Sequence, residues 1–344
     1  MNNYQFDSLK FVTEGLTGGA CTVIADEKGL PSFMIPINKR TNAQLFDGGS
    51  EKTHSAFIVD DVEYKRFFFS KFINCVVDGL AYSWPLMDPM TSIDYDASHA
   101  ACNAKGTGWH MASIPERAVI NHLIYKSGFI PRGNTQYGKH HTYTYEVGEL
   151  TKSDGSGVTV TGSGPATWFH DGTRNGIADY VGNVWKWASG MRVYDGELQI
   201  FVGNLAAKQV SHAADSTYWK AVLPNGSLVE PGTSGTLKYT KDCKIATDAG
   251  VTGKGSISSF GSLAAGTGVS EIPEILKELF LAPAGGFTHT GAFFINNEGE
   301  RIPMISGCYG DASNAGPSTL SICELRTRAG SGFFSAYMEL EPES

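Results

Sequence analysis

The chain has 344 residues, of which 41% are hydrophobic, 18% are charged and 41 are glycine, and its formal net charge is −8. The length suits one large domain or two ordinary ones, and the glycine-rich, charge-poor composition is typical of β-rich or loop-rich proteins rather than helical bundles. No run of Lys and Arg and no long apolar stretch occurs, which argues against nucleic-acid binding and against a transmembrane helix.

The N-terminal ten residues contain no basic region followed by an apolar region, which predicts that no signal peptide is present. The chain has six scattered cysteines and no C-x-x-C pair, which argues against zinc-ribbon and thioredoxin-like sites. Without a secretion signal, we expect reduced and mostly buried thiols. The six are Cys21, Cys75, Cys102, Cys243, Cys308 and Cys323.

The first 54 residues predict a small N-terminal β-rich module. Two strand-like runs, around Cys21–Ala25 and Ser32–Pro36, flank a turn-forming "DEKGLP" segment. The polar, glycine-containing stretch from Phe46 to His54 reads as a linker. Residues 55–344 are then expected to form a second, larger domain.

Two helices are predicted early in that larger domain. The first begins at Asp94 or Asp96, either of which can cap it, and ends at Gly106. The second begins at Ser113, has a capping-box pattern with Glu116, and ends at Gly128.

After Gly128 helical periodicity is almost absent until "SEIPEILKELFLAP" near Ser270. The intervening sequence predicts loops and short strands, with residues 192–260 as an insertion.

The segment "DYVGNVWKW" places Trp185 and Trp187 two residues apart, after a Gly182–Asn183 turn. Residues i and i+2 of a strand share a face, so both rings can pack on one layer. Large aromatic side chains can organise a core where regular secondary structure is sparse, and we interpret these two in that way.

Together, "GWHMASIPERA", "DYVGNVWKW" and the C-terminal "SGCYGDASNAGPSTLSICELRTRAGSGFFSAYMEL" resemble the formylglycine-generating-enzyme branch of the C-type lectin fold. The resemblance covers roughly residues 55–340, and its most specific part is "GNVWKW". It implies an α+β, C-type lectin-like domain of the formylglycine-generating-enzyme-like subtype.

The resemblance also points to a structural calcium site, because members of the family bind a calcium ion partly through the Asn and Glu of "GNVWEW". Here Asn183 is present, but Lys186 stands at the Glu position, and an ammonium group cannot coordinate a cation. We therefore expect no cofactor, with a structural calcium ion as the alternative. Asp171 and Asn175 supply other oxygen atoms nearby in the sequence, and we interpret them as turn formers.

The enzymes of this branch use two C-terminal cysteines that bind copper. Cys323 loosely matches the second of these, but the partner position is Ser318, which is a poor Cu(I) ligand. The nine histidines form no assignable metal triad, including His99, His110, His122, His140 and His141. We expect no enzymatic activity; the alternatives are a divergent copper oxidase using Cys323 with Cys308, or a purely structural virion component.

A non-catalytic group within the fold comprises variable proteins diversified by retroelements, such as phage tropism determinants. The resemblance implies a ligand-binding, receptor-recognising protein whose C-terminal segment displays the binding surface. The composition of residues 306–335, rich in small and polar side chains, suits adaptable contacts. The candidate ligand-binding residues are Cys308, Tyr309, Gly310, Ala312, Asn314, Ser321, Cys323, Glu324, Arg328 and Ser331.

Four of these residues (Cys308, Gly310, Ala312 and Asn314) alternate and would share one side of an extended segment. The partner implied is a protein or glycan ligand on a cell surface, with no nucleic acid and no membrane insertion. A homo-oligomer would add avidity. The expected location is the virion surface, or the bacterial cytoplasm before assembly.

Overall fold

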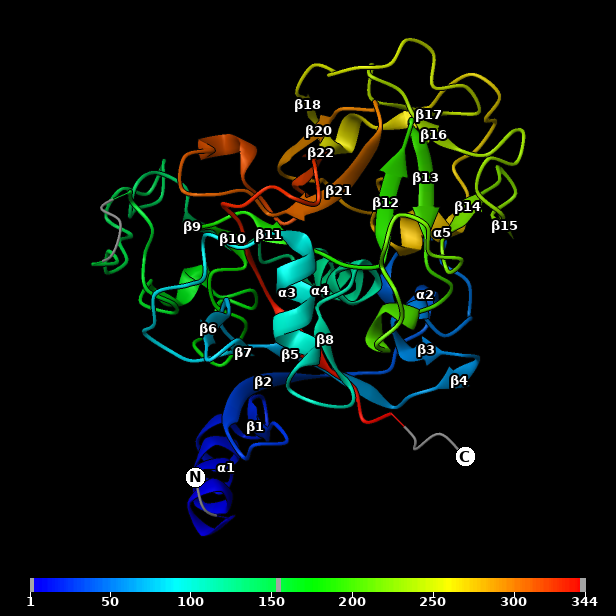
Figure 1. Ribbon diagram of the computed structural model, residues 1–344. Helices are drawn as coiled ribbons and strands as arrows, with labels where there is room; N and C mark the ends of the chain where they lie inside the picture. The colour runs from blue at the N-terminus through cyan, green and yellow to red at the C-terminus, as the bar shows by residue number, and fades with distance from the viewer. Residues whose placement is uncertain (1–2, 153–155, 341–344) are drawn as a thin grey trace.

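The structure is a computed structural model that describes residues 3–152 and 156–340. It is a mixed α+β protein built mostly of short strands, with few helices and a large, curled sheet (Figure 1). The helices of the described residues are α1 Asn3–Thr17, α2 Asn42–Leu45, α3 Tyr95–Asn103, α4 Ile114–Ser127 and α5 Glu274–Glu278.

The two helices predicted from capping signals are confirmed as α3 and α4. Asp94 caps α3, since its side chain accepts a hydrogen bond from the backbone N–H of Ala97 at 2.8 Å. Ser113 and Glu116 form the expected capping box of α4, and Gly128 ends the helix with a φ of +75°. That left-handed conformation is one that glycine adopts without steric cost.

The N-terminal helix α1 was not expected from the sequence. It occupies 15 residues within the segment that we predicted to be β-rich. It packs against β1 and extends away from the rest of the molecule (Figure 1). Its apolar residues do not all face the core, so the periodic pattern that normally reveals a helix is weak.

One antiparallel sheet joins the two ends of the chain. Its order is β1-β2-β5-β24-β8, and the predicted strands around Cys21–Ala25 and Ser32–Pro36 are confirmed as β1 and β2. Strand β2 pairs with β5, so the sheet crosses the boundary placed after residue 54; an independent N-terminal module stays a prediction. The strands are β1 Thr22–Ala25, β2 Pro31–Asn38, β5 Arg66–Ser70, β24 Ser335–Tyr337 and β8 Trp109–Met111.

The larger sheet contains 13 described strands and includes most of the strands between residues 186 and 333. Much of the predicted insertion, residues 192–260, contributes strands to this sheet. The strands are β11 Lys186–Trp187, β12 Met191–Tyr194, β13 Glu197–Ile200, β14 Lys220–Val222, β15 Leu228–Val229, β16 Lys238–Tyr239, β17 Lys244–Ala246, β18 Ser258–Ser259, β19 Ala264–Ala265, β20 Ala292–Ile295, β21 Glu300–Ile305, β22 Leu320–Glu324 and β23 Gly332–Phe333.

Three short strand pairs complete the described β-structure. Two are antiparallel and one, β9 with β10, is parallel. They are β3 Ile58–Val59 with β4 Val62–Glu63, β6 Cys75–Val77 with β7 Leu80–Tyr82, and β9 Gly133–Asn134 with β10 Val181–Gly182.

The paired tryptophans pack as the sequence predicts. Trp187 is 1% exposed, and its indole N–H donates to the carbonyl oxygen of Ile93 at 3.2 Å. Trp185 is partly buried against the same apolar cluster, which includes Tyr95 and Phe333. Trp187 therefore stabilises the junction of α3 with the larger sheet, because its ring packs against Tyr95 of α3, whereas the Trp185 ring packs against Phe294 of β20.

Candidate functional site

The Gly182–Asn183 turn joins three distant segments. Both residues have positive φ, a conformation open to glycine and tolerated by asparagine. The Asn183 side chain bonds the backbone N–H and carbonyl of Thr159 at 2.9 and 3.0 Å and accepts from the Asn134 amide at 3.2 Å. Its carbonyl accepts from the N–H of Tyr309 at 3.0 Å. This turn therefore positions residues 307–319, which we call the first C-terminal loop.

Lys186 is fully buried beside this turn. Its ammonium donates to the carbonyl oxygens of Gly182 at 2.5 Å and Tyr180 at 3.3 Å. Burial lowers the pKa of Lys186 to about 7. The Lys186 amino group thus contacts carbonyl oxygens of and just before the turn, while the Asn183 side chain is occupied by protein groups.

Asp171 and Asn175, interpreted from the sequence as turn formers, lie in a turn. Asp171 accepts hydrogen bonds from the backbone N–H and hydroxyl of Thr173, and Asn175 lies in the same turn. Within residues 3–152 and 156–340, no group of three or more His, Cys, Asp or Glu side chains is arranged to hold a metal ion.

The first C-terminal loop, residues 307–319, differs from the expected extended segment. The Asp311 carboxylate accepts the N–H of Cys308 at 2.7 Å, and a 3-10 turn spans Ala312–Asn314. The expectation that Cys308, Gly310, Ala312 and Asn314 alternate along an extended strand is therefore wrong. The turn forms because an aspartate side chain can satisfy the backbone donors that a strand would pair with a neighbour.

Of the ten predicted contact residues, eight have at least partial exposure. Gly310 and Arg328 are exposed, and six are partly exposed: Cys308, Tyr309, Ala312, Asn314, Cys323 and Glu324. The prediction that Ser321 and Ser331 contact a ligand is wrong, because these residues are only 4% and 0% exposed. Ser321 lies in the interior strand β22, and the Ser331 hydroxyl contacts the sulfur of Met304.

An exposed tyrosine not singled out from the sequence, Tyr137, lies against the first C-terminal loop. The ring of Tyr137 lies 5.3 Å from that of Tyr309, and the Tyr137 N–H donates to the Tyr309 carbonyl. Tyr137 is 66% exposed, and Tyr143 and Tyr145 on the same loop are also exposed. Their only sequence signal is the "QYGKHHTYTY" stretch, about 170 residues before Tyr309 in the chain.

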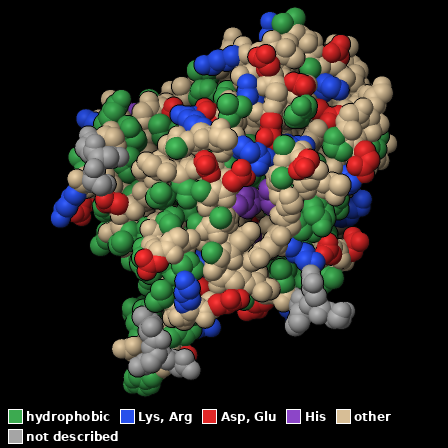
Figure 2. All heavy atoms as spheres, viewed as in Figure 1, with side chains coloured by type: hydrophobic (Ala, Val, Ile, Leu, Met, Phe, Trp, Pro, Cys, Tyr) green, Lys and Arg blue, Asp and Glu red, His purple; other side chains and the backbone are tan. Residues whose placement is uncertain are grey.

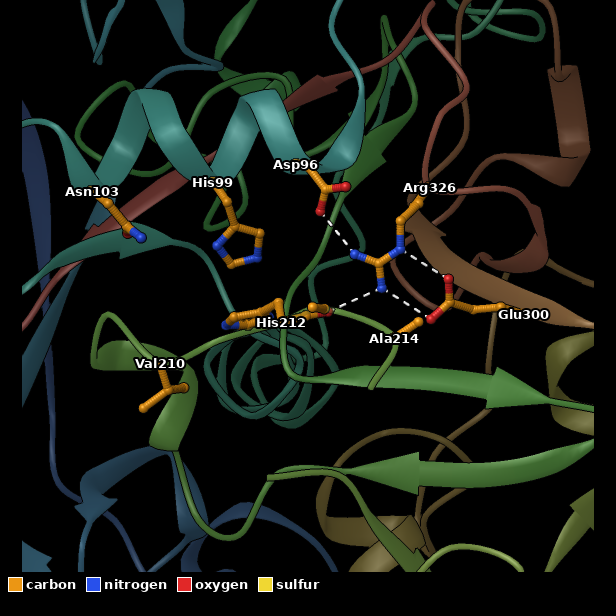
Figure 3. Close-up of a pocket in the computed structure, with 9 residues that line it drawn as sticks. Asp96, His99, Asn103, Val210, His212, Ala214, Glu300 and Arg326 are labelled. Atoms are coloured by element: carbon orange, nitrogen blue, oxygen red, sulfur yellow. Dashed lines mark hydrogen bonds and ion pairs between the residues drawn. The ribbon is translucent and has the colours of Figure 1, made fainter. Parts of the chain in front are cut away.

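The second C-terminal loop, residues 325–330, begins beside a polar pocket of about 370 Å³. Arg326 donates to both oxygens of Glu300 at 2.8 and 2.9 Å, and to Asp96 at 2.8 Å (Figure 3). Arg192 also donates to Glu300. Burial alone would raise the pKa of Glu300, but hydrogen bonds from Arg326 and Arg192 lower it below its usual value.

Two histidines line the pocket beside this charge network. The rings of His99 and His212 lie 3.9 Å apart, and each side chain has a buried Nε2 atom without a hydrogen-bond partner. The Tyr95 hydroxyl bonds Nδ1 of His212 at 3.1 Å. Burial and then Arg326 lower the pKa of His212 to about 3, and burial and then His212 lower that of His99. Both rings are therefore neutral near pH 7.

Asn103 contributes a third buried polar atom without a partner, its Oδ1. Histidine side chains are visible in a hollow of the surface (Figure 2), and its walls come from α3, the loop after residue 207 and the C-terminal segment. The pocket can accommodate a small polar molecule or ordered water. It is lined by Asp96, His99, Asn103, Val210, His212, Ala213, Ala214, Glu300 and Arg326.

The six cysteines are unpaired, and four of them are buried, as expected: Cys21, Cys75, Cys102 and Cys243. Burial raises the pKa of Cys308 to about 12, and the neighbouring Asp311 carboxylate adds to this effect. Burial also raises the pKa of Cys323. Both side chains are thiols rather than thiolates near pH 7.

None of the helices in the described parts of the chain is both long and apolar enough to cross a lipid bilayer. Comparison with protein-family models and with curated proteins finds no match for this chain.

Proposed function

We propose that this chain is a non-catalytic, ligand-binding protein with a C-type lectin-like fold of the formylglycine-generating-enzyme-like subtype. The binding surface comprises the exposed parts of the two C-terminal loops, residues 307–319 and 325–330, with the flanking tyrosines of residues 137–145. The ligand is a protein or glycan on a cell surface. We associate the protein with a phage or a diversity-generating retroelement, on the virion surface or in the bacterial cytoplasm before assembly.

One observation carries this proposal: buried strands alternate with exposed loops in the C-terminal segment. Leu320, Ile322 and Phe333 are fully buried, whereas most of residues 325–330 are exposed. Side chains in the loops can therefore vary without disturbing the core. Small polar residues combined with exposed tyrosines are also the composition of antibody binding loops.

The state of the two cysteines favours binding over oxidation. A copper site of this kind needs thiolate ligands, and burial raises the pKa of both Cys308 and Cys323, which disfavours the thiolate form of each in the metal-free chain. In addition, the backbone N–H of Cys308 donates a hydrogen bond to the Asp311 carboxylate, which holds Cys308 in a turn.

The first test is to sequence this locus in many sibling isolates. We expect substitutions at exposed positions of residues 307–330, with Leu320, Ile322 and the "GNVWKW" segment unchanged. A C-terminal segment as constant as the rest of the chain would contradict a diversified surface.

The second test measures binding of the fluorescently labelled chain to a glycan array and to intact bacterial cells. Tyr137→Ala and Tyr145→Ala should each weaken any binding at least about tenfold, because aromatic anchors dominate such interfaces. Tyr218→Ala is the matched control, since Tyr218 is 42% exposed but lies outside the proposed surface. Binding that survives both loop variants would contradict the proposed surface.

A further inference from the structure

Helix α1 presents an apolar face that nothing in the described chain covers. Tyr4, Phe11 and Leu16 are 80%, 78% and 82% exposed, and Val12 is 52% exposed. These are among the most exposed large apolar side chains of the described residues. On a helix of 3.6 residues per turn they project to one side, together with the small residues Ser8 and Gly15 and the polar residue Gln5.

The opposite side of α1 is already in use. Phe6, Leu9 and Thr13 are partly buried, and α1 packs against β1. Glu14 accepts a hydrogen bond from the Thr22 hydroxyl at 2.6 Å, which fixes the helix on that strand. The exposed apolar face is therefore held outward and cannot turn inward without breaking these contacts.

We propose that this face pairs with the same face of a second copy of the chain, as two antiparallel α1 helices related by a two-fold axis near Lys10. Tyr4 and Leu16 are equally far from that residue along the helix. Tyr4 then lies opposite Leu16 of the second copy, and Ser8 lies opposite Val12 of the second copy. The two Phe11 rings meet beside the axis. A face that complements itself in this way is the requirement of a two-fold interface.

The exposed area is adequate for a small dimer interface. Aromatic side chains carry about 150–250 Å² each and Leu and Val less, so Tyr4, Phe11, Val12 and Leu16 together expose at most on the order of 600 Å² per copy. Complete burial in both copies would remove roughly 1,200 Å² in total, so the pairing reaches at most the lower end of specific protein–protein interfaces. We therefore expect a dimer that dissociates on dilution.

Charge favours a second copy over a lipid surface. The apolar face carries no charged residue, and the other side of the helix carries Asp7, Lys10 and Glu14. Helices that lie on membranes instead have several Lys or Arg residues along their polar face. This inference does not depend on the proposed function, because α1 lies outside the proposed binding surface.

The test measures the mass of the full chain by sedimentation velocity from about 1 µM to about 100 µM, the range in which a small interface dissociates. The wild-type chain should shift from monomer to dimer. Phe11→Glu and Leu16→Glu should each remain monomeric throughout. Val251→Glu is the matched control, since Val251 is 69% exposed outside α1, and it should dimerise like wild type.

A wild-type chain that stays monomeric at the highest concentration overturns the proposal, and so does a Phe11→Glu chain that still dimerises. At about 1 µM, where every chain is expected to be monomeric, far-UV circular dichroism and melting temperatures should be the same for all variants, because the replaced side chains are exposed. The helix register is tested by disulfide cross-linking in a Cys308→Ser, Cys323→Ser background.

In that background, a mixture of Tyr4→Cys and Leu16→Cys chains should cross-link faster than either chain alone. Faster self-cross-linking of Tyr4→Cys would overturn the antiparallel register. Co-sedimentation with phosphatidylcholine and phosphatidylserine vesicles tests the other occupant. The proposal would be overturned in favour of a lipid surface if the wild-type chain stays monomeric in solution, binds the vesicles, and loses that binding in Phe11→Glu.

Discussion

Two buried polar clusters hold the C-terminal loops, and they differ in how completely the side chains at their centres, Asn183 in one and the His99 and His212 rings in the other, are paired. Around Asn183, each polar atom of the side chain is bonded to Thr159 or Asn134. Around Arg326, the charged groups are paired, but Nε2 of His99 and of His212 has no partner. The first cluster therefore specifies one backbone arrangement, whereas the second leaves buried hydrogen-bonding capacity beside a pocket.

The largest effect is expected from Asn183→Ala. The change leaves the buried N–H and carbonyl of Thr159 without partners and removes one of the two hydrogen bonds donated by the Asn134 amide, which still donates to Gly157. It also places alanine at a positive φ. We expect the free energy of unfolding to fall by about 3–5 kcal/mol, because each unsatisfied buried group costs about 1–3 kcal/mol. Urea denaturation measures this loss.

Asn175→Ala serves as the control for that substitution, because Asn175 lies in an exposed turn. Its stability should change by less than about 0.5 kcal/mol. Equal losses for the two variants would show that the Asn183 hydrogen bonds contribute little.

A smaller effect is expected from Arg326→Ala. Glu300 and Asp96 each lose a charged partner, but Arg192 still donates to Glu300. We expect a loss of about 2–3 kcal/mol, since hydrogen bonds to charged groups contribute about 1.5–3 kcal/mol. Arg328→Ala is the matched control: its pair with Glu324 is surface-exposed and should contribute less than about 1 kcal/mol.

The smallest effect is expected from the pH response of the His99–His212 pair. The lowered pKa of His212 means that the unfolded chain takes up a proton near pH 6.5, whereas the folded chain does so only near pH 3. Stability is therefore full above pH 6.5 and falls as the pH decreases through that window. Each such proton changes the free energy of unfolding by up to about 1.4 kcal/mol per pH unit.

Comparison of wild type with His212→Gln should isolate the loss of stability caused by protonation of His212 in the unfolded chain. This loss should reach about 1 kcal/mol at pH 5.5. His141→Gln is the control, because His141 is partly exposed and its pKa is less constrained by burial. A wild-type chain whose loss of stability between pH 7 and pH 5.5 matches that of His212→Gln would contradict a neutral, buried His212.

Local signals in the sequence predicted several elements well. Asp94, Ser113 with Glu116, and Gly128 fix the ends of α3 and α4 through contacts within a few residues. The turn at Gly182–Asn183 and the packing of Trp187 were likewise predictable, because glycine, asparagine and tryptophan each have strong conformational or burial preferences.

The elements that the sequence did not predict depend on contacts between distant residues. The apolar face of α1 points to solvent, so its pattern does not indicate a core-facing helix. Asp311 converts the expected strand at Cys308 into a turn through one side-chain hydrogen bond. The pairing of Arg326 with Asp96 spans 230 positions in the sequence, and no local pattern indicates it.

The place of β24 has a consequence for synthesis on the ribosome. This strand, Ser335–Tyr337, inserts between β5 and β8, and the hydroxyls of Ser70 and Ser335 lie 2.7 Å apart. The first sheet therefore cannot close until nearly all of the described chain has been translated, and the edges of β5 and β8 stay open until then. Open strand edges promote aggregation, so the nascent chain should depend on chaperones until translation passes Tyr337.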